Sequence, residues 1–176
     1  MPNGPASPGI QQAVAAVDWT AYAMAPSAQW YRPDTVPAAF ELLLAVSDED
    51  EGRAAYNAML FAVGNNHAGL LYPAAVPAAP LLARVARERE SWIRWAALEI
   101  LIEFTAFRSD REEFVDPSGT VVRPRYAIIA PIRNLKQHLQ LMAEHEGSGA
   151  PTAQSARELL DRLLDAEKGW TGSGSD

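Results

Sequence analysis

The sequence contains no cysteine, and this absence removes three kinds of chemistry at once. Disulfide frameworks, thiolate metal sites and cysteine nucleophiles all require the thiol group. The chain also lacks the ~20 uninterrupted apolar residues of a membrane span, and its first residues, MPNGPASPGI, place no positive charge ahead of an apolar run. We therefore expect a cytoplasmic protein that makes no contact with a membrane.

Motifs of the common catalytic sites are missing as well. The chain has no serine nucleophile elbow, no glycine-rich phosphate loop and no zinc-binding spacing. His138 and His145 are seven residues apart, whereas helical metal ligands usually stand four apart. We expect these two histidines to lie on a solvated face near a helix end. The sequence thus predicts a protein that is not an enzyme and that carries no metal or cofactor.

Basic residues are too few for a nucleic-acid-binding protein of the usual kind. The chain has 15 Lys and Arg against 22 Asp and Glu, a net charge of −7. Binding to a nucleic-acid backbone needs a concentrated basic surface. The charge balance argues against nucleic acid and favours a basic protein as partner.

Alanine and leucine dominate what is present. Hydrophobic residues make up 48% of the 176 residues, enough for one domain with a substantial core. Ala and Leu have the best intrinsic helix propensities, so helix is the expected secondary structure.

A short repeat indicates how these helices are organised. Val36-Pro37-Ala38-Ala39 recurs as Val76-Pro77-Ala78-Ala79, forty residues later, and each copy opens a Leu-rich segment, a charged turn and a second apolar segment. Both prolines suit the first turn of a helix. Units of two helices and ~40 residues are typical of HEAT and armadillo repeats. The pattern predicts an all-α, HEAT/armadillo-like α-α superhelix of about three helical hairpins.

We place the boundaries of this single domain at residues 10–168. The predicted repeats cover about 34–64, 74–107 and 126–167, with an insertion loop or short hairpin at 108–125, and residues 1–9 and 169–176 are expected to be disordered. In the third repeat the first helix is predicted to run to Ala143 and the second from Thr152 to Ala166. Gly52, Gly64 and Gly147 are expected to end helices.

Residues 17 to 107 carry a family resemblance. The motifs are Val17-Asp18-Trp19, Val36-Pro37-Ala38 after a polar turn, and Asn66-His67-Ala68-Gly69 followed by Tyr72-Pro73-Ala74. This segment resembles a family of actinobacterial HEAT-repeat-containing proteins, in which the third motif looks like His-Gln-Gly-Thr-Val-Tyr. Here Gln and Thr are replaced by Ala68 and Leu70. The resemblance implies an α-α superhelix, and some similar proteins look like immunity or adaptor components.

The second helix of each predicted repeat supplies the candidate binding face. Exposed tryptophan is enriched at binding hot spots. The alternative, which the sequence favours equally, is that a neighbouring repeat or the insertion loop covers both indoles. On this face we place the following partner-binding residues: Tyr56, Asn57, Trp92, Trp95 and Glu99.

The loop between the first two repeats adds Asn66, His67 and Tyr72 to the candidates. These residues either bind a partner or line a polar pocket, while asparagine in such loops more often bonds the local backbone.

Together these features predict a protein-binding helical-repeat scaffold. Its most concrete form is an immunity protein, as in toxin-antitoxin pairs, that binds and neutralises a basic, nuclease-type toxin. The alternative function is a small-molecule-binding or enzymatic helical domain that uses a pocket around Asn66, His67 and Tyr72.

Overall fold

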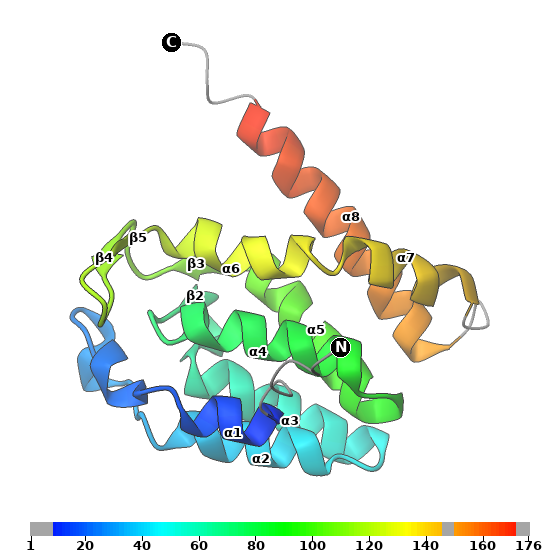
Figure 1. Ribbon diagram of the computed structural model, residues 1–176, viewed down its shortest axis with the longest axis horizontal. Helices are drawn as coiled ribbons and strands as arrows, with labels where there is room; N and C mark the ends of the chain where they lie inside the picture. Colours follow the sequence, from blue (N-terminus) through cyan, green and yellow to red (C-terminus); the bar gives the residue numbers. More distant parts are fainter. Residues whose placement is uncertain (1–8, 146–149, 172–176) are drawn as a thin grey trace, which may run out of the picture.

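A computed structural model describes residues 9–145 and 150–171, and most of these residues are helical (Figure 1). The longer helices are α1 (Ile10–Ala15), α2 (Thr35–Ala45), α3 (Glu49–Ala62), α4 (Ala75–Glu88), α5 (Ser91–Ala106), α6 (Pro124–Arg133), α7 (Lys136–His145) and α8 (Pro151–Thr171). The prediction of an all-α protein is confirmed at this level. Among the described helices, none combines the length and the apolar character of a membrane span.

Three pairs of successive helices pack against each other. α2 packs on α3, α4 on α5, and α7 on α8, while α3 and α8 both contact α5 and α6 contacts α4. Figure 1 shows α6 and α7 end to end beside α4, with α2 and α3 on the other side of α4. The short helix α1 packs against both α2 and α4. Pro37 and Pro77 each occupy the third position of a helix, as predicted.

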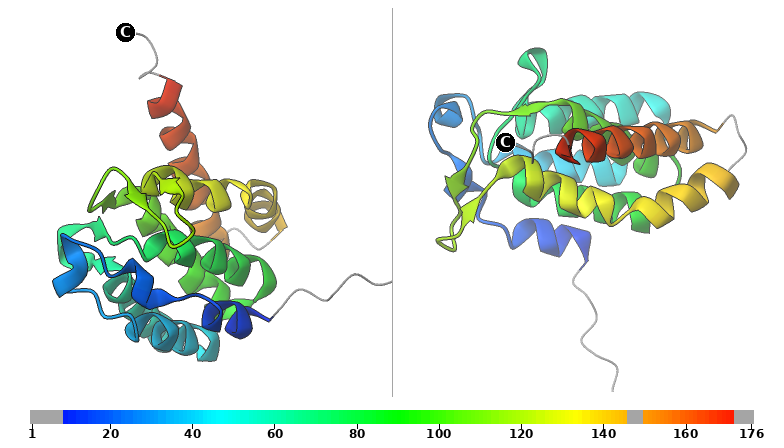
Figure 2. Two further views of the ribbon diagram at one scale, coloured as in Figure 1. Left: turned by 60° about the vertical axis from the view of Figure 1, so that its left-hand side comes forward. Right: turned by 90° about the horizontal axis from the view of Figure 1, so that it is seen from above.

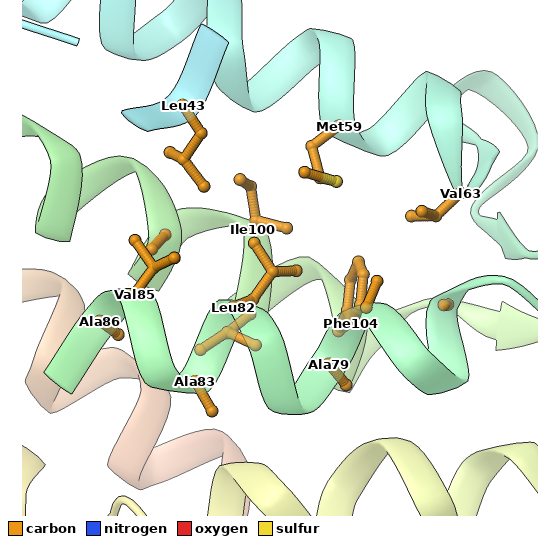
Figure 3. Packing of buried hydrophobic residues seen from close by; sticks show 14 of the residues in the cluster. Leu43, Met59, Val63, Ala79, Leu82, Ala83, Val85, Ala86, Ile100 and Phe104 are labelled. Carbon is orange, nitrogen blue, oxygen red and sulfur yellow. The ribbon is translucent and has the colours of Figure 1, made fainter. Parts of the chain in front are cut away.

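The centre of the core is α5. Ala97, Ile100 and Phe104 form one apolar stripe along it and are fully buried. Leu98 and Leu101, outside that stripe, are fully buried as well, because α5 has α3, α4 and α8 packed around it. Figure 3 shows Ile100 and Phe104 between the side chains of α4 and those of α3. A helix in this position needs apolar residues on more than one face.

The third helix pair differs from its prediction. A helix was expected to run unbroken to Ala143, but it is divided into α6 and α7 at Asn134 and Leu135. The N–H of Leu135 donates to the carbonyl of Ile132, three residues back, at 3.0 Å, so the chain tightens there into a 3₁₀-like turn. One apolar stripe nevertheless stays buried across the break, and it consists of Ile129, Ile132, Leu135, Leu139 and Met142.

The last helix also extends beyond its predicted end at Ala166. α8 continues to Thr171, so residues 169–171, expected to be disordered, are helical. Its C-terminal half projects past the other helices (Figures 1 and 2). The remaining residues predicted to be disordered, 1–8 and 172–176, and Gly147 as a helix end, lie outside the described residues.

Short strands lie at one end of the helix pairs. β1 (Gly64–Asn65) pairs antiparallel with β2 (Leu70–Leu71), and β2 pairs parallel with β3 (Arg108–Ser109). The rest of the insertion forms a hairpin, which is one of the two predicted forms: β4 (Phe114–Val115) pairs antiparallel with β5 (Val121–Val122). The pairing of β2 with β3 brings the loop after α3 beside the residues that follow α5.

Candidate functional site

The start of α3 is fixed by local hydrogen bonds. The Asp48 carboxylate accepts from the N–H of Glu51 at 2.9 Å, and the Glu51 carboxylate accepts from the N–H and hydroxyl of Ser47, both at 2.8 Å. Acidic residues in the first turn also suit the positive end of the helix dipole. α3 therefore begins within the acidic run, and the later part of α3 packs against α5.

The prediction that Gly52 ends a helix is wrong. Gly52 lies in the first turn of α3 and is buried. A Cβ placed on it would stand 3.0 Å from the six-membered ring of Trp95 on α5. Glycine is needed at this position because α3 and the Trp95 ring approach each other closely. The backbone of Gly52 itself is helical.

Trp92 and Trp95 form the centre of the candidate face. Their rings meet edge to face, with centroids 5.4 Å apart and planes at 87°. The guanidinium carbon of Arg53 lies 5.7 Å from the centroid of the Trp95 ring, within the range of a cation–π contact. Both tryptophans are half-buried. The tryptophans are therefore neither fully exposed nor fully covered, because α3 covers part of the pair and part stays accessible.

Two polar contacts join this face across three helices. The Tyr56 hydroxyl on α3 donates to Glu103 on α5 at 3.1 Å, and burial, reinforced by the charge of Glu103, raises the pKa of Tyr56. Ser155 on α8 is buried, and its hydroxyl lies 2.5 Å from Glu99 on α5 and 3.0 Å from the carbonyl of Pro151. A half-buried carboxylate held by a neutral hydroxyl stays available to a cationic group.

The exposed part of the face runs along α3. Asn57 is exposed, and its amide donates to the carbonyl of Arg53 at 3.0 Å. One turn later Phe61 is 49% exposed. His67 packs edge to face on Phe61, with ring centroids 5.2 Å apart. We define the α3–α5 face by the residues that make these contacts: Arg53, Tyr56, Asn57, Phe61, Trp92, Trp95, Glu99 and Glu103.

The loop candidates Asn66, His67 and Tyr72 do not gather in one pocket. Asn66 and His67 lie in a short 3₁₀ helix, η3 (Asn66–Ala68), where His67 is exposed. Tyr72 is buried and lines a pocket of about 340 Å³ in which Asn65 takes part and the other two do not. Asn65 also caps η3, because its side-chain oxygen accepts from the N–H of Ala68 at 3.2 Å. This capping is the structural role that turn asparagines commonly have.

Sequence reasoning missed Arg53 and Ser155 as parts of the face. Arg53 contacts a residue 42 positions away in the chain, and Ser155 one that is 56 away. No local pattern signals such contacts.

His138 does not lie on a solvated face as expected. It is half-buried, and its Nε2 is buried without a hydrogen-bond partner among the described residues. Burial lowers the pKa of His138, and the positive charges of Arg94 and Arg87 lower it further. The side chain of His145 lies outside the described residues.

The lowered pKa of His138 predicts a stability that falls on mild acidification. Below the ordinary histidine pKa of about 6.5 the unfolded chain binds a proton that the folded chain resists. Stability is therefore complete above that pH and decreases as the pH falls through it. We expect His138→Leu to flatten the decrease in melting temperature between about pH 7.5 and 5.5. The control Asn57→Gln changes an exposed side chain that does not titrate and should keep the wild-type slope. Equal slopes for all three proteins would contradict the prediction.

Comparisons with protein-family models, with curated proteins and with solved structures give no match for this chain, so its membership of a HEAT-repeat family stays a prediction from the sequence.

Proposed function

We propose that this chain is a protein-binding helical-repeat scaffold of the HEAT-like kind. The order of packing supports this architecture, because each helix pair lies against the next one in the chain. The two copies of Val-Pro-Ala-Ala start at the second position of α2 and of α4, so they are equivalent in place as well as in sequence. Stacked pairs of this kind offer a broad, rigid surface.

The α3–α5 face is the proposed binding surface, and the Trp92–Trp95 pair is the observation that carries it. Tryptophan, tyrosine and arginine are the residues most often found at interface hot spots. Here all three types occur together: Trp95 lies between Trp92 and Arg53, and Tyr56 is one turn from Arg53. Their mutual contacts fix the side chains in advance, so little conformational entropy is lost on binding.

Charge indicates the class of partner. The chain carries a net charge of −7, and the acidic residues that open α3 are exposed beside Arg53. Glu99 and Glu103 add two half-buried carboxylates to the face. Complementary charge speeds association and selects against wrong partners. The partner we propose is a basic protein, and the most concrete version is a nuclease-type toxin that this chain, as an immunity protein without enzymatic activity of its own, would neutralise by direct binding.

Site-specific crosslinking tests both the partner and the face. A photoreactive residue would replace exposed Asn57 on α3 or, as a control, exposed Leu42 on α2. In the cells that express the protein, we expect one basic protein to be captured stoichiometrically from position 57 and not from position 42. Capture of no stoichiometric protein, or equal capture from both positions, would overturn the proposal.

Trp95→Ala gives the quantitative test on that partner. Removal of a central aromatic hot spot costs about 2 kcal/mol or more, so we expect binding to weaken at least about thirtyfold. Titration calorimetry would measure it. Because Trp95 is half-buried and its loss also affects folding, Asn57→Arg serves as a second variant that adds bulk and positive charge at an exposed position. Unchanged affinity in both variants would count against the α3–α5 face.

A further inference from the structure

We propose that the pocket between the 3₁₀ helix η2 (Ser27–Gln29), β2 and β3 binds a small aromatic carboxylate. The pocket is separate from the α3–α5 face, and the inference does not depend on the proposed partner. Its volume of about 340 Å³ suits a ligand of one or two rings. The residues that line it come from three segments far apart in the chain: Pro26, Ser27, Trp30, Asn65, Leu70, Tyr72, Arg108, Ser109 and Asp110.

The rim and walls favour a flat apolar group. Trp30 is 62% exposed, the most exposed large hydrophobic side chain among the described residues. Pro26 and Leu70 add apolar surface nearby. An exposed indole beside a hollow of this size offers a stacking surface that nothing in the described chain covers. An aromatic ring of the ligand would bury it.

Tyr72 supplies an unused hydrogen-bond donor. Only 6% of the residue is exposed, and its ring packs edge to face on Tyr31, with centroids 6.2 Å apart. Its hydroxyl makes no hydrogen bond to any described residue and is not among the side-chain atoms buried without a partner, so the hydroxyl is accessible. Because Tyr72 lines the pocket, an acceptor atom of a ligand there would satisfy the hydroxyl. The amide nitrogen of Asn65 is a second donor of this kind, since only its oxygen is engaged.

The balance of charge favours an anion. Asp110, which also lines the pocket, pairs with Arg111 through two contacts, at 2.9 and 3.2 Å, and this pairing offsets its negative charge. Arg108 is exposed and makes no side-chain hydrogen bond or ion pair within the described residues, which leaves one positive charge in excess. Arg108 also borders a neighbouring hollow that Glu112 and Glu113 line, but the two glutamates do not line this pocket. In an otherwise acidic chain, this is a local site for a carboxylate.

The geometry therefore combines a stacking surface with a charged donor and a phenolic donor. A carboxylate bound by Arg108 and Tyr72 would keep the attached ring in the pocket that Trp30 also lines. An aliphatic carboxylate would lose the stacking, and the matching amide would lose the charge.

Titration of nitrogen-15-labelled protein with 2-naphthoate tests the site. The readout is the chemical shift of the indole N–H resonance of Trp30. Trp30→Phe assigns that resonance. We expect a saturable shift with 2-naphthoate and one at least about tenfold weaker in affinity with 2-naphthamide, the neutral analogue. Arg108→Gln should weaken 2-naphthoate binding about tenfold, and Tyr72→Phe about three- to tenfold.

Matched variants separate the site from general effects. Arg89→Gln removes an exposed arginine at the end of α4, and Tyr22→Phe removes a hydroxyl outside the pocket; both should bind like the wild type. Arg108 is exposed, so Arg108→Gln leaves the core intact. The proposal is overturned if Trp30 shows no saturable shift, if the amide binds as well as the acid, or if Arg108→Gln has no more effect than Arg89→Gln. None of these outcomes bears on capture of a protein by the α3–α5 face.

Discussion

Replacing Phe104 by alanine is expected to lower the free energy of unfolding by about 3–5 kcal/mol. Phe104 is fully buried on α5, where Figure 3 shows it between Val63 and Ala79. The small residues of α4 around it have no side chains long enough to fill the space that the ring would leave. The variant therefore loses the free energy gained by burying the ring, and it also contains a cavity. Both effects lower the free energy of unfolding.

Urea denaturation measures this difference, with Phe61→Ala as the matched control. Phe61 is 49% exposed, so its truncation removes little buried surface and should cost less than about 1 kcal/mol. The denaturation midpoint should shift strongly in the first variant and little in the second. Similar losses for both would mean that α5 is not the centre of the core.

The second large effect is expected at Gly64, where a single methyl group cannot be accommodated. A Cβ on Gly64 would stand 2.3 Å from the carbonyl oxygen of Leu70, on the strand paired with it. That oxygen belongs to the backbone and cannot rotate away as a side chain would. We expect Gly64→Ala to destabilise the fold by about 3 kcal/mol, because β2 must move from β1 or the pairing must break.

Gly9→Ala is the control for this substitution, since nothing lies within 4 Å of a Cβ at Gly9. Its free energy of unfolding should stay within about 0.5 kcal/mol of the wild type. Amide hydrogen exchange at Tyr72 would locate the damage, because its N–H donates to the carbonyl of Val63 at 2.8 Å, next to the β1–β2 pairing. This amide should lose protection in Gly64→Ala and keep it in Gly9→Ala. Unchanged protection and stability in both variants would contradict the close approach of β1 and β2.

Glycine shows how far sequence reasoning reaches in this chain. Gly64 does follow a helix, as predicted, but it is required by a close approach to a strand that the sequence did not reveal. Gly52 lies inside a helix, because Trp95 needs the space above its backbone. A glycine in a sequence indicates that a side chain is unfavourable at that position. The reason becomes clear only from the residues that lie next to it in the folded chain.

The candidate site was predicted in part. Tyr56, Trp92, Trp95 and Glu99 were chosen as residues of second helices, and contacts join three of the four to residues on other helices. Their partners were not predictable, because they lie more than forty residues away. Trp30 and Arg108 had no pattern to mark them, and they lie at one pocket because β2 pairs with β3.

Local sequence patterns were enough to establish the helical class, the first two helix pairs and the prolines in their first turns. These follow from local physics: helix propensity, apolar periodicity and capping act within a few residues of one another. The tertiary structure alone decided which helix is surrounded, why Gly52 and Gly64 must lack a side chain, and where a pocket opens beside Tyr72. Such features depend on which distant segments come into contact, and the energies that select those contacts belong to the packed chain as a whole.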